Sequence, residues 1–332
     1  MKKLVILAAL MFCACIVMQA QEFQSKHFII QKLADGVYTA IAKNGGYAIC
    51  NAGIIDLGDA TLIFDPFMTP EAAEDLKKVS FELTNHAVKY VVNSHFHNDH
   101  IGGDQVFPDA SLISTQRTRE LIEEYQPQEI ADDKKNASVT AQKVKEENTS
   151  GYTGHQLEEH TMWLGYYEAL ATSSDSLKIV LPNITFSDSL IIHGTKRQVK
   201  LITYGEGHTE SDLFLYLPNE HIAFLGDLLF IKNQPWVGDG DVDKWKLYLD
   251  SIAKLNLEIV VPGHGPVGKP SDIAFMKLYF QNIDDVAREY QRKRINPRDD
   301  TTLTPPKPFS DWFLSNFYKP NVISEYNRLD KK

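Results

Sequence analysis

The chain has 332 residues, of which 43% are hydrophobic, and its 34 basic and 44 acidic side chains give a formal net charge of −10. This length allows one large domain or two small ones, and the apolar fraction is that of an ordinary globular protein. The acidic balance excludes the basic surface that nucleic-acid binding requires, so we expect no nucleic-acid partner. The composition does not indicate an oligomeric state.

The N-terminus has the pattern of a secretory signal peptide over residues 1–20. Two lysines precede an apolar run over residues 4–17, and Ala20 is a small residue at the expected cleavage site. The run is short for a membrane span, so we predict an exported protein, periplasmic or secreted, without stable membrane insertion after cleavage. A lipid anchor on Cys15 is the alternative, but the apolar run continues past this residue. Cleavage would leave Cys50 as the one cysteine, without a disulfide partner.

The first part of the mature chain has the pattern of β-strands followed by a helix. Short segments rich in β-branched and aromatic residues, separated by turn residues, predict strands over residues 37–42, 49–56 and 61–65. Thr69-Pro70 then provides a good N-cap and a good first helical residue. The apolar segment 88–92 that follows the helix predicts another, buried strand.

Four metal-ligand side chains follow that buried strand within six positions. They are His95, His97, Asp99 and His100, and Gly102-Gly103 then allows a sharp turn of the backbone. Imidazole and carboxylate are the usual protein ligands of zinc. In extended backbone, His95 and His97 lie on one face, whereas the adjacent Asp99 and His100 point differently, which suits a second metal ion. A surface turn or a salt-bridged loop is the alternative interpretation of this cluster alone.

The central part of the chain contains a long polar segment. A strand over 110–114 and a helix over 116–124 are followed by residues 125–180, which are charged and have a mostly helical pattern. Three aromatic residues cluster there: Trp163, Tyr166 and Tyr167. We weigh two interpretations, an insertion that packs on the body of the protein and a lid over the metal loop whose aromatic side chains contact the substrate.

Strand patterns return from residue 184 onward, and three of the later strands lead into glycine-flanked polar residues. These residues are His208, Asp227 and His264. Strand ends at one edge of a sheet converge in space, and ligands bind there. An amphipathic helix over 245–255, a helix over 271–292 and a short aromatic tail complete the chain.

The four polar motifs together carry a resemblance to a known family. In order they are His95-Phe96-His97-Asn98-Asp99-His100, Gly207-His208-Thr209-Glu210-Ser211-Asp212, Gly226-Asp227 and Pro262-Gly263-His264-Gly265. With them, roughly residues 37–268 resemble the metallo-β-lactamase superfamily. The resemblance implies an α/β fold, the αββα sandwich. One domain would span residues 21–332, with a helical insertion at about 125–180 and a C-terminal helical extension at about 271–332.

The resemblance also implies a dinuclear site with two zinc ions (Zn2+) per chain. Its ligands would be His95, His97 and His208 for one ion, Asp99, His100 and His264 for the other, and Asp227 bridging both. Such ions can share a hydroxide that attacks a carbonyl or phosphoryl group of a small-molecule substrate. Asp99 would also be the catalytic residue that holds or passes a proton. Asp65 resembles the family's early aspartate, which braces the metal loop without binding metal.

The residue at position 227 guides the expected reaction. Asp227 stands where the best-known antibiotic-hydrolysing relatives have cysteine or serine, and an aspartate there is similar to the thioesterase, lactonase and phosphodiesterase branches. We therefore expect a hydrolase of an ester, thioester, lactone or related bond. The first alternative is a true metallo-β-lactamase, in which Lys232 is a candidate contact for the carboxylate of the drug. The second is a mononuclear iron sulfur dioxygenase, and the third is a non-catalytic binding protein on the same fold.

Overall fold

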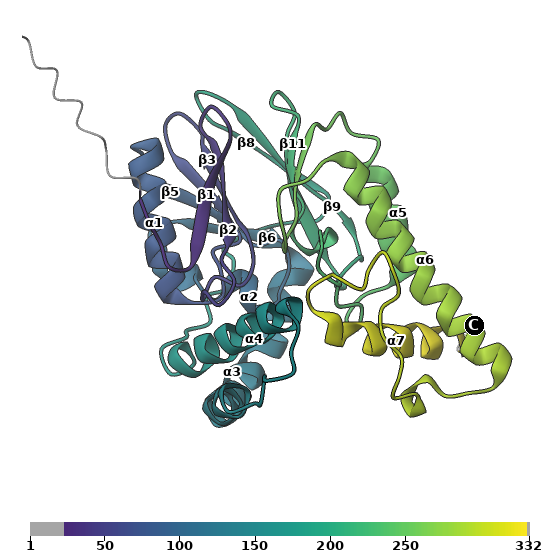
Figure 1. Ribbon diagram of the computed structural model, residues 1–332. Helices are drawn as coiled ribbons and strands as arrows, with labels where there is room; N and C mark the ends of the chain where they lie inside the picture. The colour runs from purple at the N-terminus through teal and green to yellow at the C-terminus, as the bar shows by residue number, and fades with distance from the viewer. Residues whose placement is uncertain (1–22, 331–332) are drawn as a thin grey trace, which may run out of the picture.

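Two β-sheets packed face to face form the centre of the molecule, and helices cover the outer face of each sheet (Figure 1). The structure is a computed structural model that describes residues 23–330, so the predicted signal peptide lies outside the described residues. Side chains from both sheets fill the space between them, and the rings of Phe64 and Phe224 meet there with centroids 6.1 Å apart. This arrangement confirms the predicted αββα sandwich.

The first sheet is built from the N-terminal half of the chain, with its strands in sequence order. Strands β1 to β4 pair antiparallel and β4 to β7 pair parallel. The strands are β1 (Phe28–Ala34), β2 (Val37–Ala42), β3 (Ala52–Asp56), β4 (Thr61–Phe64), β5 (Val88–Val92), β6 (Ser111–Thr115) and β7 (Ile184–Phe186). Helix α1 (Pro70–Thr84) covers the outer face, with the Thr69 hydroxyl accepting from the backbone N–H of Ala72. The expected N-cap is therefore present.

The second sheet is built from the C-terminal half, in the order β12-β11-β10-β9-β8. Its strands are β8 (Ser189–His193), β9 (Gln198–Gly205), β10 (Asp212–Leu217), β11 (Ile222–Phe224) and β12 (Ile259–Val261). Helices α5 (Val242–Ile252) and α6 (Pro270–Lys293) pack on its outer face, where fully buried Trp245 and Phe280 lie in contact. The large apolar cluster behind this sheet is the expected result of two amphipathic helices that bury one face each.

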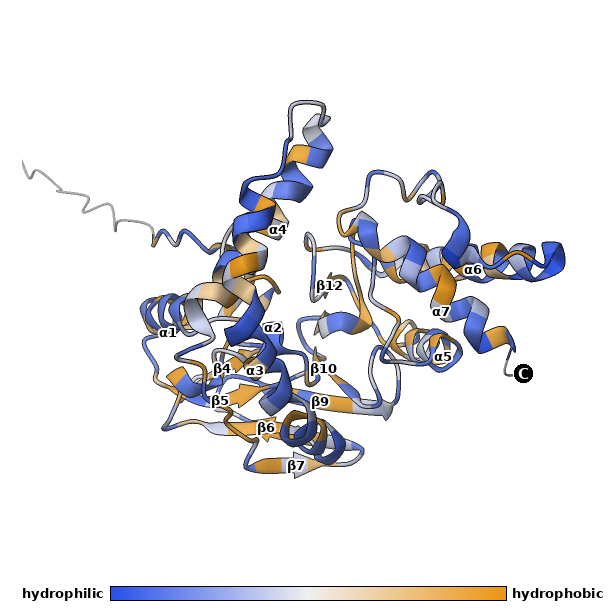
Figure 2. Ribbon diagram, turned by 90° about the horizontal axis from the view of Figure 1, so that it is seen from below, coloured by the Kyte–Doolittle hydropathy of each residue, from blue (hydrophilic) through white to orange (hydrophobic). Residues whose placement is uncertain are grey.

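Three further helices lie at the edge of the sandwich where β5, β11 and β12 end. They are α3 (Gln116–Lys145), α4 (Gly154–Ser173) and α7 (Tyr318–Asp330). Seen from below, α4 and α7 lie on either side of this edge, with β12 between them (Figure 2). Among residues 23–330, no helix combines the length and the apolar character needed to cross a membrane.

Two predicted elements have different bounds in the structure. The helix expected over 116–124 continues through Pro127 to Lys145. A proline removes one helical hydrogen bond, but Ala137 farther along α3 packs with Ala169 of α4, and this burial supports the longer helix. The strand expected over 49–56 begins only at Ala52, because Ile49 has a positive φ of 69° and the preceding residues form a loop.

Short helices complete the chain. They are the one-turn α2 (Asn98–Ile101) and the 3₁₀ helices η1 (Asp104–Val106), η2 (Gly226–Leu228), η3 (Pro297–Asp299) and η4 (Ser315–Phe317). Cys50 is buried and has no disulfide partner among the described residues.

Candidate metal centre

The predicted ligands converge because the loops that carry them leave the two sheets at the same edge. The loop after β5 carries the first four, and the β9–β10 connection carries His208. Asp227 lies in η2 directly after β11, and His264 follows β12. The structure brings all seven side chains together in two groups, and within each group the candidate ligand atoms lie within 4.8 Å of one another. Each sheet contributes part of the set.

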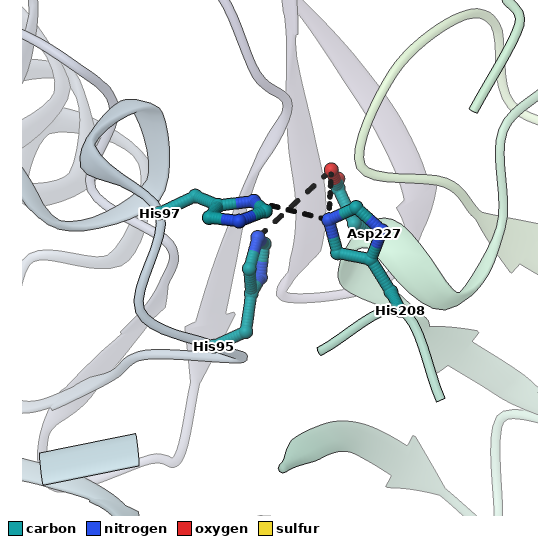
Figure 3. A group of neighbouring side chains, drawn as sticks. All are labelled: His95, His97, His208 and Asp227. Carbon is teal, nitrogen blue, oxygen red and sulfur yellow. Dashed lines mark hydrogen bonds and ion pairs between the residues drawn. The ribbon is translucent and has the colours of Figure 1, made fainter. Parts of the chain in front are cut away.

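The first group contains His95, His97, His208 and Asp227, whose side chains point toward one another from both sheets (Figure 3). His208 Nε2 lies 3.0 Å from His97 Nδ1 and 3.3 Å from Asp227 Oδ2. His95 Nε2 lies 3.9 Å from the same carboxylate oxygen. Three imidazole nitrogens and one carboxylate oxygen therefore lie within 4.8 Å of one another, and four such ligands are the number that a tetrahedral zinc ion takes.

The second group contains Asp99, His100 and His264. His264 Nε2 lies 3.2 Å from Asp99 Oδ2. The other oxygen of the shared carboxylate faces this group, since Asp227 Oδ1 lies 3.1 Å from His100 Nε2 and 3.4 Å from His264 Nε2. Asp227 thus presents one oxygen to each group, which is the geometry that a bridging ligand requires.

Hydrogen bonds behind the ligands orient their rings. The buried carboxylate of Asp65 accepts from the backbone N–H of Ser94 at 2.7 Å and from its hydroxyl at 2.7 Å. His100 Nδ1 lies 2.8 Å from the same carboxylate and donates to it, so a neutral His100 ring would turn the lone pair of Nε2 toward the centre. His208 Nδ1 likewise donates to the carbonyl of Trp236 at 3.0 Å. Asp65 therefore lies where a brace of the metal loop should lie.

The sequence reasoning missed a second brace, Asp239. Its Oδ2 lies 3.1 Å from His97 Nε2 and accepts a 2.9 Å hydrogen bond from the indole N–H of Trp236. His97 consequently turns its Nδ1, rather than Nε2, toward His208. Asp239 and Trp236 lie on the loop between η2 and α5, which has no periodic pattern, so no signal in the sequence distinguishes them from other loop residues.

The pKa values of the ligand side chains are shifted in both directions by burial and by their neighbours. Burial lowers the pKa of His95 well below its ordinary value, and burial lowers that of His208 to about 3. Burial alone would raise the pKa of Asp227, but the neighbouring His264 and His100 hold it well below the ordinary value. Burial would likewise lower the pKa of His264, yet the carboxylates of Asp227 and Asp99 raise it to about 9. His95, His208 and Asp227 therefore have the donor states that a metal ion needs, whereas the pKa values of His97, His100 and His264 are raised, so these rings would release protons when a metal ion binds.

Unsatisfied buried atoms also point to a ligand. His95 Nε2, His100 Nε2 and Asp227 Oδ1 are inaccessible to solvent and make no hydrogen bond to the described residues. Buried polar atoms are nearly always hydrogen-bonded, so three atoms in one cluster without a hydrogen bond require an explanation, although His100 Nε2 and Asp227 Oδ1 face each other at 3.1 Å. A divalent cation in each ligand group would satisfy all of them.

Close backbone packing holds the shared carboxylate in place. A Cβ atom on Gly263 would lie only 1.9 Å from Asp227 Oδ1, and one on Gly226 would lie 2.6 Å from the Cβ of Ser94. Gly226 also has a positive φ of 51°. Only glycine allows the β11 and β12 loops to approach the metal loop so closely.

The centre opens into a cavity of about 570 Å³. Of the candidate substrate contacts, Trp163, Tyr166 and Lys232 line it, whereas Tyr167 lies behind Trp163 with ring centroids 6.1 Å apart. The predicted helical segment over residues 125–180 therefore contributes side chains to the cavity wall. The sequence reasoning did not identify several other lining residues: Glu129, Trp236, Asp239, Phe313, Leu314 and Phe317.

A two-sheet sandwich that gathers histidines and aspartates from both sheets at one edge defines a class of metal-dependent proteins. The sequence profile of the Metallo-beta-lactamase superfamily matches residues 45–264, and the chain belongs to this superfamily of metal-dependent hydrolases. The match includes all seven candidate ligands and ends at His264.

Similarity to individual proteins is low but extends over much of the chain. A "Metallo-beta-lactamase type 2" from Pseudomonas aeruginosa is 24% identical over 82% of this chain and 90% of its own length. A "Beta-lactamase-like protein 2 homolog" from Caenorhabditis elegans is 25% identical over 72% of this chain and 64% of its own. The solved structure of a metallo-beta-lactamase from Pontibacter korlensis superimposes with a TM-score of 0.56 at 19% identity, covering 77% of this chain and 99% of that one. The similarity to the Pontibacter korlensis structure supports the assignment of the fold.

Proposed function

We propose that the protein is an exported hydrolase that holds two zinc ions and cleaves an ester, thioester, lactone or related bond of a small molecule. The observation that carries this proposal is the position of Asp227, whose Oδ2 faces one ligand group while its Oδ1 faces the other. A carboxylate that presents one oxygen to each of two ligand groups suits a site for two ions. Five imidazoles with carboxylate oxygens are also a ligand set that suits zinc.

The metal pair, when bound, would lower the pKa of water to give a nucleophile near neutral pH and would polarise the attacked group. The residues of the chain have separate tasks. Asp65 and Asp239 orient His100 and His97. Asp99 lines the cavity, so it is placed to hold the proton that passes to the leaving group.

A true β-lactamase is the second candidate, and two observations favour it. Lys232 lines the cavity, where its ammonium group would attract a substrate carboxylate. The Pseudomonas relative named above is also a metallo-beta-lactamase. We favour ester-like substrates because Asp227 resembles the aspartate found at this position in the branches of the family that cleave such bonds.

One set of measurements on the zinc-loaded protein separates these functions. The values of kcat/KM for a chromogenic cephalosporin, a lactone and a thioester are compared on the same sample, together with the same assays on Lys232→Ala. We expect the lactone or thioester to be the better substrate. A cephalosporin preference above about tenfold, equal to about 1.4 kcal/mol, would replace our proposal with the β-lactamase function. Selective loss of cephalosporin activity in Lys232→Ala would then assign the carboxylate contact.

The metal content tests the remaining alternatives. Zinc and iron are measured on protein purified with its native metal, and we expect two zinc ions per chain. One iron per chain with oxygen consumption would support a sulfur dioxygenase instead. Bound metal without turnover of any of the three substrates would support a binding protein. Export is tested by N-terminal sequencing of the secreted chain, which we expect to begin near Gln21, whereas a lipid on Cys15 would contradict simple cleavage.

A further inference from the structure

Three aromatic rings from distant parts of the chain form one wall of the cavity. They are Trp163 of α4, Trp236 of the loop after η2, and Phe317 of η4. The Phe317 ring lies between the two indoles, 5.8 Å from Trp163 and 5.4 Å from Trp236, and meets both at steep angles of 73° and 60°. All three are only partly buried. We call these three residues the aromatic slot.

The part of the slot that comes from the C-terminal tail is anchored at two places. The carboxylate of Glu159 on α4, which is only 9% exposed, accepts from the hydroxyl of Ser315 at 2.7 Å and also from its backbone N–H. On the other side, the backbone N–H of Phe313 donates to the carbonyl of Lys232 at 2.9 Å. The tail is therefore held against both halves of the cavity, although it lies beyond the region matched to the superfamily.

The slot lies directly beside the first ligand group. The carbonyl of Trp236 accepts from His208 Nδ1, and its indole N–H donates to Asp239, the brace of His97. A group held in the slot would therefore be positioned next to the reacting centre. Asp239 Oδ2 is engaged by both His97 and Trp236.

We infer that the aromatic slot is a substrate-binding element that takes a flat, uncharged apolar group, such as an aromatic ring on the acyl part of the substrate. Partly exposed rings at the wall of a cavity gain free energy when an apolar group covers them, and aromatic groups also pack against ring faces and edges with favourable geometry. The inference rests on the proposed hydrolase function, since it names one feature of the substrate.

A binding experiment on the metal-free protein tests the slot independently of hydrolysis. Neutral 4-phenylbutyramide and butyramide are titrated against the wild type and followed by calorimetry and by tryptophan fluorescence, to which Trp163 and Trp236 contribute. We expect tighter binding of the phenyl compound and a loss of at least about tenfold for it in Phe317→Ala. Phe81→Ala, which removes an exposed ring on the outer helix α1, is the matched control and should bind like the wild type.

Kinetics on the zinc-loaded protein provide the second readout. We expect a phenylacetyl thioester to be preferred over an acetyl thioester, and Phe317→Ala to reduce this preference at least about tenfold, mainly through the KM of the phenylacetyl compound. If Phe317→Ala does not fold, Trp163→Ala is used in the same two experiments, with the same expectation.

The outcomes distinguish the slot from the proposed function. Equal binding of the two amides, or unchanged binding and preference in a folded slot variant, would overturn the inference and leave the three rings as a packing contact between α4 and the tail. Absence of turnover with both thioesters alongside selective binding of the phenyl amide would support the slot as a binding site while contradicting the proposed acyl hydrolysis.

Discussion

Replacing Asp65 by asparagine should weaken metal binding although Asp65 itself is not a ligand. The carboxylate is fully buried and accepts three hydrogen bonds, two from Ser94 and one from His100 Nδ1. An asparagine that keeps its oxygen toward the backbone N–H of Ser94 must turn its NH₂ group toward His100. The His100 imidazole can accept a hydrogen bond from this NH₂ group only if its own proton moves from Nδ1 to Nε2, the atom that faces Asp227.

The expected magnitude follows from these contacts. Partners behind a metal-binding histidine typically contribute 10–100-fold to metal affinity, which is about 1.4–2.7 kcal/mol. In addition, each buried donor left without an acceptor costs about 1–3 kcal/mol of folding free energy. We therefore expect Asp65→Asn to lower zinc affinity by about 10–100-fold and to lower the unfolding temperature of the metal-free protein.

The assay is competition for zinc with a chelator of known affinity, combined with thermal unfolding of the metal-free protein. Asp104→Asn is the matched control, because it makes the same change at a buried carboxyl group that accepts a hydrogen bond from Asn93 and none from a ligand histidine. We expect the control to lose less zinc affinity than Asp65→Asn. Equal zinc affinity of Asp65→Asn and the wild type would refute the proposed control of the His100 tautomer.

Three other substitutions have defined expected outcomes. Asp227→Ala removes the carboxylate that faces both ligand groups, so elemental analysis should find that at least one of the two expected zinc ions is lost; two retained ions with full activity would contradict the bridge. Asp239→Ala removes the brace of His97 and should lower zinc affinity by about 10–100-fold in the chelator assay; an unchanged affinity would show that the brace is unnecessary. Burial raises the pKa of Glu129 to about 7, so the folded protein retains a proton that the unfolded chain releases, and stability falls as pH rises from about 4.5 to about 7. In urea unfolding, metal-free Glu129→Gln should therefore match the wild type at pH 4 and exceed it at pH 8 by on the order of 1–3 kcal/mol, whereas a less stable variant at pH 8 would contradict this reasoning.

The fold and the position of the candidate ligands could be predicted because their signals are local. Each ligand follows a short apolar strand and lies beside glycine or within a dense run of polar residues, as at His208 and His264. The N-cap at Thr69 is likewise read from two adjacent residues. Such patterns determine where a strand or helix ends, and the shared edge of the sheets then brings the ends together.

Features that depend on long-range contacts could not be predicted. The continuation of α3 past Pro127 depends on packing against α4, which local propensity does not include. The bracing role of Asp239 exists only because its loop folds back onto His97. Ser315 and Glu159 meet across 156 positions of sequence, so the aromatic tail could be recognised in the sequence but not placed.

Because the ligands are divided between the two sheets, cleavage of the chain between the sheets would divide both ligand groups. The chain completes the first sheet at Phe186 before it begins the second at Ser189, so a single break between these residues would yield one fragment per sheet. Neither fragment would carry a full ligand group, since His208, Asp227 and His264 belong to the second and the other four ligands to the first. Zinc uptake would then report reassembly of the two fragments, and free zinc concentration would set how firmly they stay together.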